Sequence, residues 1–465
     1  MLVLSAAARD PDSVTETMKK FGCPGATWDL GSAILEGIVR SRTGMVALVT
    51  FVLAAAVACG PGTAGRAGSS AALPAADQQA VRLAAAAAQG SPRQVRAQFE
   101  QLLGLHALLA VRQMRSVVAA APDLGQAAGV SLQQNTDALS GLVASAYGSA
   151  QADRFTPLWR RHLGDLVAYA KGVAGKDTSA RKTARAALLA DADAYGSWLA
   201  GASKGQVQAS DAAAGVRIHV EELMDQADAY AARDYAQAYR IEREAYEHMF
   251  TAGAALAKAS VTPEVAVGLE TPPERLRSAF AMLLGEHLEL IVDAQRATFA
   301  GQPEFEAAAA QVNANTTALT KAMGGIVGPT KAAEFQTAWA NHVEGLMAYT
   351  AAVAGNDETG KTAAKQNLDG FAERLGLYFS DIVRNVLAAD PLTDAITAHD
   401  THLIHHVDAY AAKDYPRAQQ LEREGYLQML GVANTLVGAI QRTVKPRLPV
   451  GGSKTGGGGL ACRRR

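Results

Sequence analysis

The chain has few cysteines. Its 465 residues contain three of them, Cys23, Cys59 and Cys462, and none lies between residues 60 and 461. A disulfide needs two cysteines, and a thiolate zinc site needs several. The long central part of the chain can therefore hold neither an internal disulfide nor a thiolate metal site.

The chain is also poor in aromatic residues, in net charge and in strand-like sequence. Aromatic residues make up 6% of it, and the formal net charge is −1. Hydrophobic residues reach 49%, much of it alanine, and no segment alternates polar and apolar residues over the length of a strand. Alanine-rich sequence favours helices that pack closely through small side chains. Because the charge is near neutral, we expect no nucleic-acid partner.

Several motifs that mark common enzyme classes are missing. The chain has no Gly-x-x-x-x-Gly-Lys-Ser/Thr loop, no Gly-x-Gly-x-x-Gly after a strand, no Gly-x-Ser-x-Gly and no Cys-x-x-Cys. The Cys-x-x-Cys-His motif that attaches haem covalently is also missing. These absences favour a binding or interaction protein over an enzyme.

An export signal is predicted near the amino terminus. Arg40 and Arg42 precede an apolar run over residues 45–58, which Cys59 follows. This pattern is typical of a secretory signal, and the run is shorter than the roughly 20 residues that span a bilayer. Residues 56–59 resemble a bacterial lipobox, although Ala56 stands where leucine is commonest. We therefore expect Cys59 to carry a lipid.

The predicted mature protein is exported and held at the outer face of the cell membrane by Cys59, so the membrane is its expected partner. A secreted protein cut near Ala58 is the alternative. Residues 1–58 would be a non-mature segment with the signal peptide, and residues 59–91 a lipidated cysteine and a flexible tether rich in Gly, Ala, Ser and Pro. Residues 444–465, which are glycine-rich and end in three arginines, are expected to form a disordered tail.

An internal match indicates that the central part is built twice. The stretch Asp228-Ala-Tyr-Ala-Ala-Arg-Asp-Tyr235 returns 180 residues later as Asp408-Ala-Tyr-Ala-Ala-Lys-Asp-Tyr415. A self-match of this kind is typical of repeated structural units. Further matches pair Phe99–His106 with Phe280–His287, Asn135–Leu139 with Asn315–Leu319, Phe155–His162 with Phe335–His342, and Glu242–Tyr246 with Glu422–Tyr426. The matches predict homologous units over residues 92–259 and 273–443, joined by a linker over 260–272.

Each unit is predicted to contain about six helices. In the first unit, turn signals and hydrophobic period place the helices over 92–122, up to about 148, and over 153–173, 179–200, 209–232 and 235–259. Short connections between them favour antiparallel neighbours. The expected fold is all-α, with two tandem up-down helical bundles that each have a core like that of a four-helix bundle.

The repeated stretch is expected to form the corner between the fifth and sixth helices of each unit. An aspartate that ends the stretch can accept hydrogen bonds from the free amides at the start of the last helix. Pro416 follows Asp414 by two residues, where a helix tolerates proline. The corner residues are Asp228, Tyr230, Asp234, Tyr235, Asp408, Tyr410, Asp414 and Tyr415.

Three histidines of the first unit have counterparts in the second. They lie on the apolar faces of the first, third and fifth helices, which run parallel in an up-down bundle, at roughly nine to fourteen residues from the helix starts. At about 1.5 Å per residue, this places them within about 8 Å of a common height. They would form a pocket for Cu, Zn, Fe or haem; alternatively, each is an ordinary core histidine with satisfied hydrogen bonds. The candidates are His106, His162 and His219, and His287, His342 and His399.

Additional ligand candidates lie on the last two helices of each unit. His402 and His406 follow His399 at a spacing of three and four, so the three share one helix face. This face is either a metal site or a solvated polar face. Glu242 and Glu422 are candidate carboxylate ligands, or partners of nearby arginines.

The repeated motifs resemble a known family. Leu-Leu-Gly-x-His, Asn-Thr-x-Ala-Leu, Trp-x-x-His and Glu-Arg-Glu-x-Tyr are similar to motifs of secreted and lipid-anchored bacterial proteins with duplicated helical-bundle modules. Many of these proteins carry the label copper amine oxidase. That enzyme makes its quinone from the tyrosine of an Asn-Tyr motif, and this chain has no Asn-Tyr pair. The resemblance therefore implies a helical-bundle fold and a location at the cell surface, and it does not imply an oxidase activity.

Taken together, these patterns predict a lipid-anchored, extracytoplasmic module for binding or interaction, and metal binding through the core histidines is a subordinate hypothesis. The alternative is a metalloenzyme, or a redox or haem protein, that uses the same histidines. No catalytic residue is assigned.

Overall fold

The computed structural model describes residues 90–443. The predicted signal segment, the lipidation site Cys59, nearly all of the tether and the tail lie outside the described residues. Within residues 90–443 there are thirteen helices and no strand. The predicted all-α fold is confirmed.

Six helices make up the first bundle, and their ends lie close to the predicted ones. They are α5 (Pro92–Val118), α6 (Pro122–Tyr147), α7 (Ser149–Ala174), α8 (Thr178–Ala202), α9 (Ala209–Ala231) and α10 (Tyr235–Ala259). The agreement arises because proline, glycine and aspartate fix the ends: Gly148, for example, lies between α6 and α7 with a positive φ of 95°.

The second bundle also has six helices, in the same order along the chain. They are α12 (Pro272–Ala300), α13 (Gln302–Val327), α14 (Pro329–Ala354), α15 (Glu358–Ile382), α16 (Ala389–Ala411) and α17 (Tyr415–Thr443). A short helix, α11 (Pro263–Gly268), lies in the segment expected to be a plain linker. Descent of the two bundles from one duplicated unit stays a prediction.

Side-chain caps begin several of these helices. Ser91 and Gln94 form a reciprocal capping box at the start of α5. Asp234 accepts from the amide of Gln237 at 3.1 Å, and Asp414 accepts from the amide of Arg417 at 3.2 Å. The two corner aspartates thus satisfy amides that would otherwise lack a partner inside the helix.

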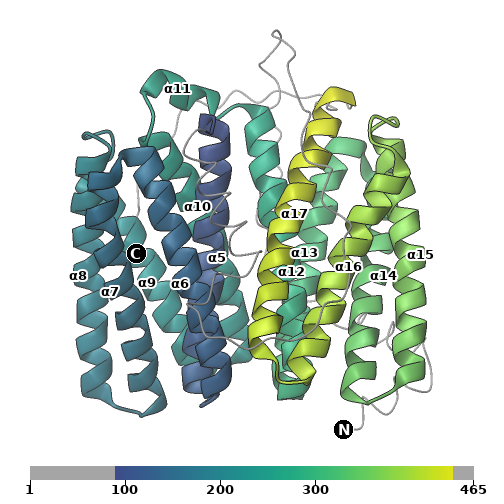
Figure 1. The fold of residues 1–465 in the computed structure, drawn as a ribbon, viewed down its shortest axis with the longest axis horizontal. Helices are drawn as coiled ribbons and strands as arrows, with labels where there is room; N and C mark the ends of the chain where they lie inside the picture. The colour runs from purple at the N-terminus through teal and green to yellow at the C-terminus, as the bar shows by residue number, and fades with distance from the viewer. Residues whose placement is uncertain (1–89, 444–465) are drawn as a thin grey trace, which may run out of the picture.

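The two bundles lie side by side (Figure 1). Helices α5, α10, α12 and α17 occupy the middle of the molecule, and α8 and α15 lie toward its two ends. Helix α5 packs along α10, and α12 packs along α17. Across the boundary, α10 contacts α13 and α17 contacts α6.

Two tyrosines meet where the bundles join. The hydroxyl groups of Tyr246 and Tyr426 are 3.3 Å apart, and both side chains are fully buried. Glycines make room for them, because a Cβ atom on Gly104 would lie 2.8 Å from Tyr246 Cε2, and one on Gly285 would lie 2.7 Å from the Tyr246 hydroxyl. Only glycine permits this approach.

Buried ion pairs also join the bundles. Arg112 of α5 reaches Glu289 of α12 at 2.6 Å, and it also contacts Glu422 of α17. Arg115 binds Glu242 at 2.5 Å within the first bundle. Removal of one partner from such a network leaves an uncompensated charge, which costs several kcal/mol. The network therefore fixes how the two bundles pair.

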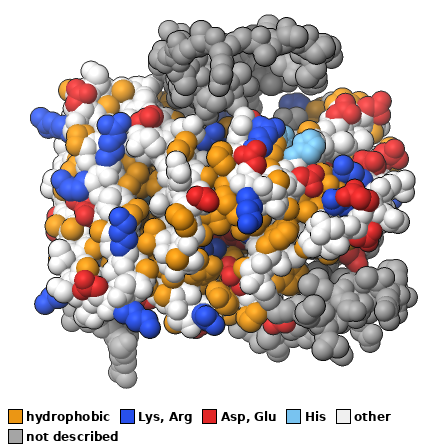
Figure 2. Space-filling model, turned by 60° about the horizontal axis from the view of Figure 1, so that its bottom comes forward, with side chains coloured by type: hydrophobic (Ala, Val, Ile, Leu, Met, Phe, Trp, Pro, Cys, Tyr) orange, Lys and Arg blue, Asp and Glu red, His pale blue; other side chains and the backbone are white. Residues whose placement is uncertain are grey.

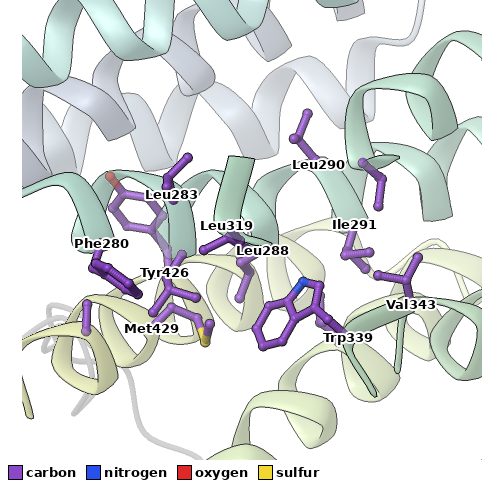
Figure 3. Packing of buried hydrophobic residues seen from close by; sticks show 14 of the residues in the cluster. Phe280, Leu283, Leu288, Leu290, Ile291, Leu319, Trp339, Val343, Tyr426 and Met429 are labelled. Atoms are coloured by element: carbon purple, nitrogen blue, oxygen red, sulfur yellow. The ribbon is translucent and has the colours of Figure 1, made fainter. Parts of the chain in front are cut away.

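Hydrophobic packing surrounds these polar contacts. Figure 3 shows part of the second bundle, where Trp339 of α14 lies between Leu288 and Val343. On the outside, Figure 2 shows charged side chains of both signs with hydrophobic side chains between them. Among residues 90–443, no helix is long and apolar enough to cross a membrane.

Candidate metal centres

The first bundle brings its three predicted histidines together. His106 comes from α5, His162 from α7 and His219 from α9. Each side chain lies on the apolar stripe of its helix, and each is at most 3% exposed. One ring nitrogen from each histidine lies within 4.8 Å of the corresponding nitrogens of the other two. The helical period thus directs all three imidazoles to one point in the core.

The second bundle repeats this arrangement with His287, His342 and His399. They come from α12, α14 and α16, and their ligand nitrogens again lie within 4.8 Å of one another. The ring centres are 5.4 to 5.6 Å apart. Within residues 90–443, these two triads are the groups of histidine, cysteine and carboxylate side chains close enough to hold one ion.

The ring nitrogens are almost all without hydrogen-bond partners. The exception is the pair His106 Nε2 and His219 Nε2, which are 3.3 Å apart. The other ten of the twelve nitrogens in the two triads have no partner. Asp400 Oδ1 lies 3.3 Å from His342 Nδ1, but the geometry does not make a hydrogen bond. Among the described residues, these ten nitrogens thus lack the protein hydrogen bonds that are expected of ordinary core histidines.

The spacing of the nitrogens fits a single ion. Imidazole nitrogens bind zinc at about 2.0–2.1 Å, which places two nitrogens of a tetrahedral site about 3.3 Å apart. The distance between His106 Nε2 and His219 Nε2 already has this value. The remaining ligand pairs lie within 4.8 Å of one another, so a change of at most about 1.5 Å in each distance would close them around an ion.

Burial sets the charge of the imidazoles. Desolvation lowers the pKa of His162 to about 4 and that of His287 to about 3. The pKa of each of the other four triad histidines is also well below its ordinary value, with burial as the main cause. All six rings are therefore neutral at pH 7, and a neutral imidazole has a lone pair for a metal.

A tryptophan packs on each triad. The ring centres of Trp159 and His106 are 4.4 Å apart, and those of Trp339 and His287 are 4.7 Å apart. Both indole N–H groups are buried without a partner. The spacing Trp-x-x-His in the sequence puts these side chains on one helix face, and it is the signal that could have assigned them to the site.

The two centres differ in their surroundings. Phe371 of α15 stacks on His342 with ring centres 4.5 Å apart, whereas the equivalent residue of α8 is Asp191. A cavity of about 30 Å³ adjoins His342 and His399 in the second bundle. Asp400 is also particular to the second centre, since Val220 takes its place in the first. Burial raises the pKa of the Asp400 carboxyl well above its ordinary value.

The other ligand candidates lie elsewhere. Glu242 binds Arg115 within the first bundle, and Glu422 contacts Arg112 across the boundary between the bundles, so neither carboxylate belongs to a triad. The ring of His406 binds Gln295 through Nδ1 at 2.8 Å.

His402 does not join the second centre either. Its Nδ1 lies 2.7 Å from the carbonyl oxygen of Ala398 in its own helix. The shared helix face of His399, His402 and His406 therefore does not form a site, because only His399 reaches the other two imidazoles.

The corner residues have structural partners. The Tyr169 hydroxyl donates to Asp228 at 3.0 Å, and the Tyr349 hydroxyl donates to Asp408 at 3.0 Å. Within each corner the two tyrosines pack edge to face, with ring centres 5.4 Å apart for Tyr230 and Tyr235 and for Tyr410 and Tyr415. These contacts fix the two corners.

Comparisons with known proteins do not assign the chain to a family. No protein-family model, no curated protein and no solved structure matches the chain. The geometry of the two triads is therefore the observation from which a function can be inferred.

Proposed function

We propose that the protein binds two transition-metal ions, one at the three-histidine centre of each bundle. The observation that carries this proposal is the set of ten buried imidazole nitrogens without a hydrogen-bond partner. A buried polar group without a partner costs about 1–3 kcal/mol. An ion held by the three rings of a centre would satisfy one nitrogen of each.

Copper(I) is the ion that the environment favours. Each triad has three neutral nitrogens and no carboxylate among its ligands. Moving a unit charge into a medium of low dielectric constant costs on the order of 20 kcal/mol in the idealised limit, and the cost scales with the square of the charge. A singly charged ion therefore pays about a quarter of the cost of a doubly charged one. Zinc and iron, which imidazole also binds, are the competing ions.

A single ion fits better than haem in the second centre. The cavity beside His342 and His399 has a volume of about 30 Å³, the space of roughly two water molecules at about 10–15 Å³ each. A porphyrin ring is many times larger. Three converging imidazoles also leave no plane for a macrocycle between them.

Thermal unfolding in the presence of metal ions tests the proposal. An ion bound only by the folded protein at 100 times its Kd stabilises that protein by about 2.7 kcal/mol per site. We expect copper(I), added without oxygen to metal-free protein, to raise Tm more than zinc(II) or iron(II). A protein with His162→Leu and His342→Leu is the control. An unchanged Tm with all three ions would contradict the proposal.

A redox or catalytic metalloprotein is the second candidate. The cavity beside the second triad favours it, because an ion there could take a further ligand. A carrier or store of copper(I) should resist oxidation, since copper(II) pays about four times the desolvation cost. A reversible copper(II)/copper(I) couple in voltammetry would favour the redox candidate, and the lack of one would favour the carrier.

We also propose that the protein acts outside the cytoplasm, tethered by lipid on Cys59. The basic residues, the apolar run and the small residues before Cys59 support this address. We expect Cys59→Ser to release the protein from the membrane fraction and to remove the lipid mass from its amino terminus. An unaltered membrane association would contradict the anchor.

A further inference from the structure

We propose that the second centre selects a divalent ion of the zinc(II) class, whereas the first centre selects copper(I). The residue that makes the difference is Asp400, which lies beside one of the three histidines of the second centre. This inference rests on the proposed function, because it assigns an ion to each of the two centres. Copper(I) offered alone fills both centres, and the selection shows only when the two ions compete.

The Asp400 carboxylate lies against the second triad without being part of it. It follows His399 on α16, and its Oδ1 lies 3.3 Å from Nδ1 of His342 on α14. Neither oxygen belongs to the group of atoms that could hold the ion itself. Metal-bound histidines commonly donate their other ring N–H to a carboxylate, which fixes the ring and makes it a stronger ligand. A small rotation of the Asp400 carboxylate would complete such a bond with Nδ1 and leave Nε2 of His342 for the ion.

Nothing in the protein offsets the charge of this buried carboxylate. Asp400 is 4% exposed, and neither of its oxygens accepts a hydrogen bond. Among residues 90–443, no arginine or lysine pairs with it. The Asp369 carboxylate of α15 acts on it electrostatically and adds negative charge. A buried carboxylate without a counter-charge costs several kcal/mol, and a cation at the triad would supply that charge and favour the ionised form.

The first centre lacks this negative charge. Val220, which is fully buried, stands at the position of Asp400. Asp191 of α8 is also buried, but it binds Arg161 at 2.7 Å, so its charge is already paired. The two centres therefore have the same three ligands and differ in the charge beside them.

The net charge of each centre decides which ion it holds. Three neutral imidazoles carry a net charge of +1 with copper(I) and +2 with zinc(II), and the desolvation cost grows with the square of this charge. The first centre therefore disfavours zinc(II). In the second centre the Asp400 carboxylate brings the zinc(II) form back to a net +1, and it attracts a divalent ion about twice as strongly as copper(I).

The size of the effect follows from the role of such a carboxylate. Loss of a group that holds a zinc-bound histidine from behind lowers the metal affinity by about 10–100-fold. Copper(I) carries half the charge and gains less from a carboxylate that is not itself a ligand. We therefore expect Asp400 to act mainly on the zinc(II) affinity.

Competition between the two ions in single-centre proteins tests the inference. The full chain with His106→Leu keeps only the second centre, and the full chain with His287→Leu keeps only the first. Each is loaded with copper(I) without oxygen and then exposed to a series of free zinc(II) concentrations that a chelator sets. Elemental analysis gives the concentration that displaces half of the copper. We expect this concentration to be at least about tenfold lower for the second centre than for the first.

Three variants isolate the role of Asp400. Asp400→Asn in the His106→Leu chain keeps the shape and removes the charge, and we expect it to lower zinc(II) affinity by about 10–100-fold and copper(I) affinity by less. Asp400→Val introduces the side chain of the first bundle and should have the same effect. Val220→Asp in the His287→Leu chain is the reverse exchange and should shift the first centre toward zinc(II). Circular dichroism checks folding, and Asp400→Val carries the comparison if Val220→Asp does not fold.

The outcomes separate this inference from the proposed function. Equal displacement of copper(I) by zinc(II) from the two centres would overturn the inference and leave both metal centres standing. An Asp400→Asn protein that loses affinity for both ions equally would also overturn it, because Asp400 would then only support the fold. Failure of both single-centre chains to retain either metal would overturn the proposed function and this inference with it.

Discussion

Replacement of a triad histidine by leucine should make the metal-free protein more stable. His399 is 3% exposed, and neither of its ring nitrogens has a hydrogen-bond partner. His406 lies on the same helix, two turns further on, and is fully buried. Its Nδ1 binds Gln295 at 2.8 Å. The variants His399→Leu and His406→Leu therefore form a matched pair on α16.

The contacts give the size of the effect. His399→Leu removes two polar groups without partners, each of which costs about 1–3 kcal/mol. It loses ring contacts with His287 and His342, at 5.5 and 5.4 Å between centres, which are worth about 0.5–1.5 kcal/mol each, and a misfit can cost about 1.5 kcal/mol. With the middle of each range, a gain of about 4 kcal/mol stands against a loss of about 2–3.5 kcal/mol, so the net gain is roughly 0.5–2 kcal/mol.

The control should move the other way. His406→Leu leaves the side-chain oxygen of Gln295 buried without its partner, and it removes a stacked contact with Tyr410. The same substitution removes Nε2 of His406, which is buried without a hydrogen-bond partner, and this offsets part of that loss. We expect His406→Leu to be less stable than the parent by roughly 1 kcal/mol.

Urea unfolding with a chelator present measures both changes. Equal slopes against urea concentration would show that the variants unfold the same surface as the parent. With copper(I) present, His399→Leu should be less stable than the parent, because this variant has lost a metal ligand. A His399→Leu protein that is clearly less stable than the parent without metal would refute the reasoning, since it would show that the imidazole is satisfied in the core.

Three further predictions concern the interface and a helix cap. Burial raises the pKa of Glu242 and that of Glu289 to about 8, so the folded protein keeps protons that the unfolded chain releases above about pH 4.5; each of the two carboxyls should lower the stability by on the order of 2 kcal/mol from pH 6 to 9, and Glu242→Gln should make a plot of urea midpoint against pH less steep by removing one of the two contributions. Gly104→Ala should cost about 1–3 kcal/mol in urea unfolding because its Cβ would lie 2.8 Å from Tyr246, whereas Gly141→Ala, with nothing nearby, should not destabilise. Asp234→Ala should lower the stability by about 1 kcal/mol in thermal unfolding, since it removes a cap.

Each of these predictions has a result that would contradict it. A pH dependence that Glu242→Gln leaves intact would assign the retained proton to another group. A Gly104→Ala protein as stable as Gly141→Ala would show that Tyr246 can move aside. An Asp234→Ala protein as stable as the parent would show that water replaces the cap.

The helices and the convergence of the triads could be predicted from the sequence. Prolines and glycines mark most helix ends, and the period of 3.6 residues assigns His162 to the same face as Trp159 and Leu166. The repeated motifs showed which residues of the second bundle correspond to which residues of the first. Helix ends and helix faces depend on residues that are close together along the chain, so they can be recognised in the sequence itself.

The interface and the cavity could not be predicted in this way. Arg112 binds Glu289, which is 177 residues away along the chain, and nothing in either local sequence indicates the pairing. The spacing of His399, His402 and His406 suggested a shared site, but helical spacing alone does not say which neighbour each ring meets. The space beside Leu375 depends on the packing of six helices together.

Metal content of the purified protein is the most direct test of the central claim. The untagged protein is equilibrated with copper(I) without oxygen, dialysed, and measured by elemental analysis against protein concentration. We expect two coppers per chain, one after either His106→Leu or His287→Leu, and none after both. A chain that retains no copper, or a double variant that retains as much as the parent, would contradict the account.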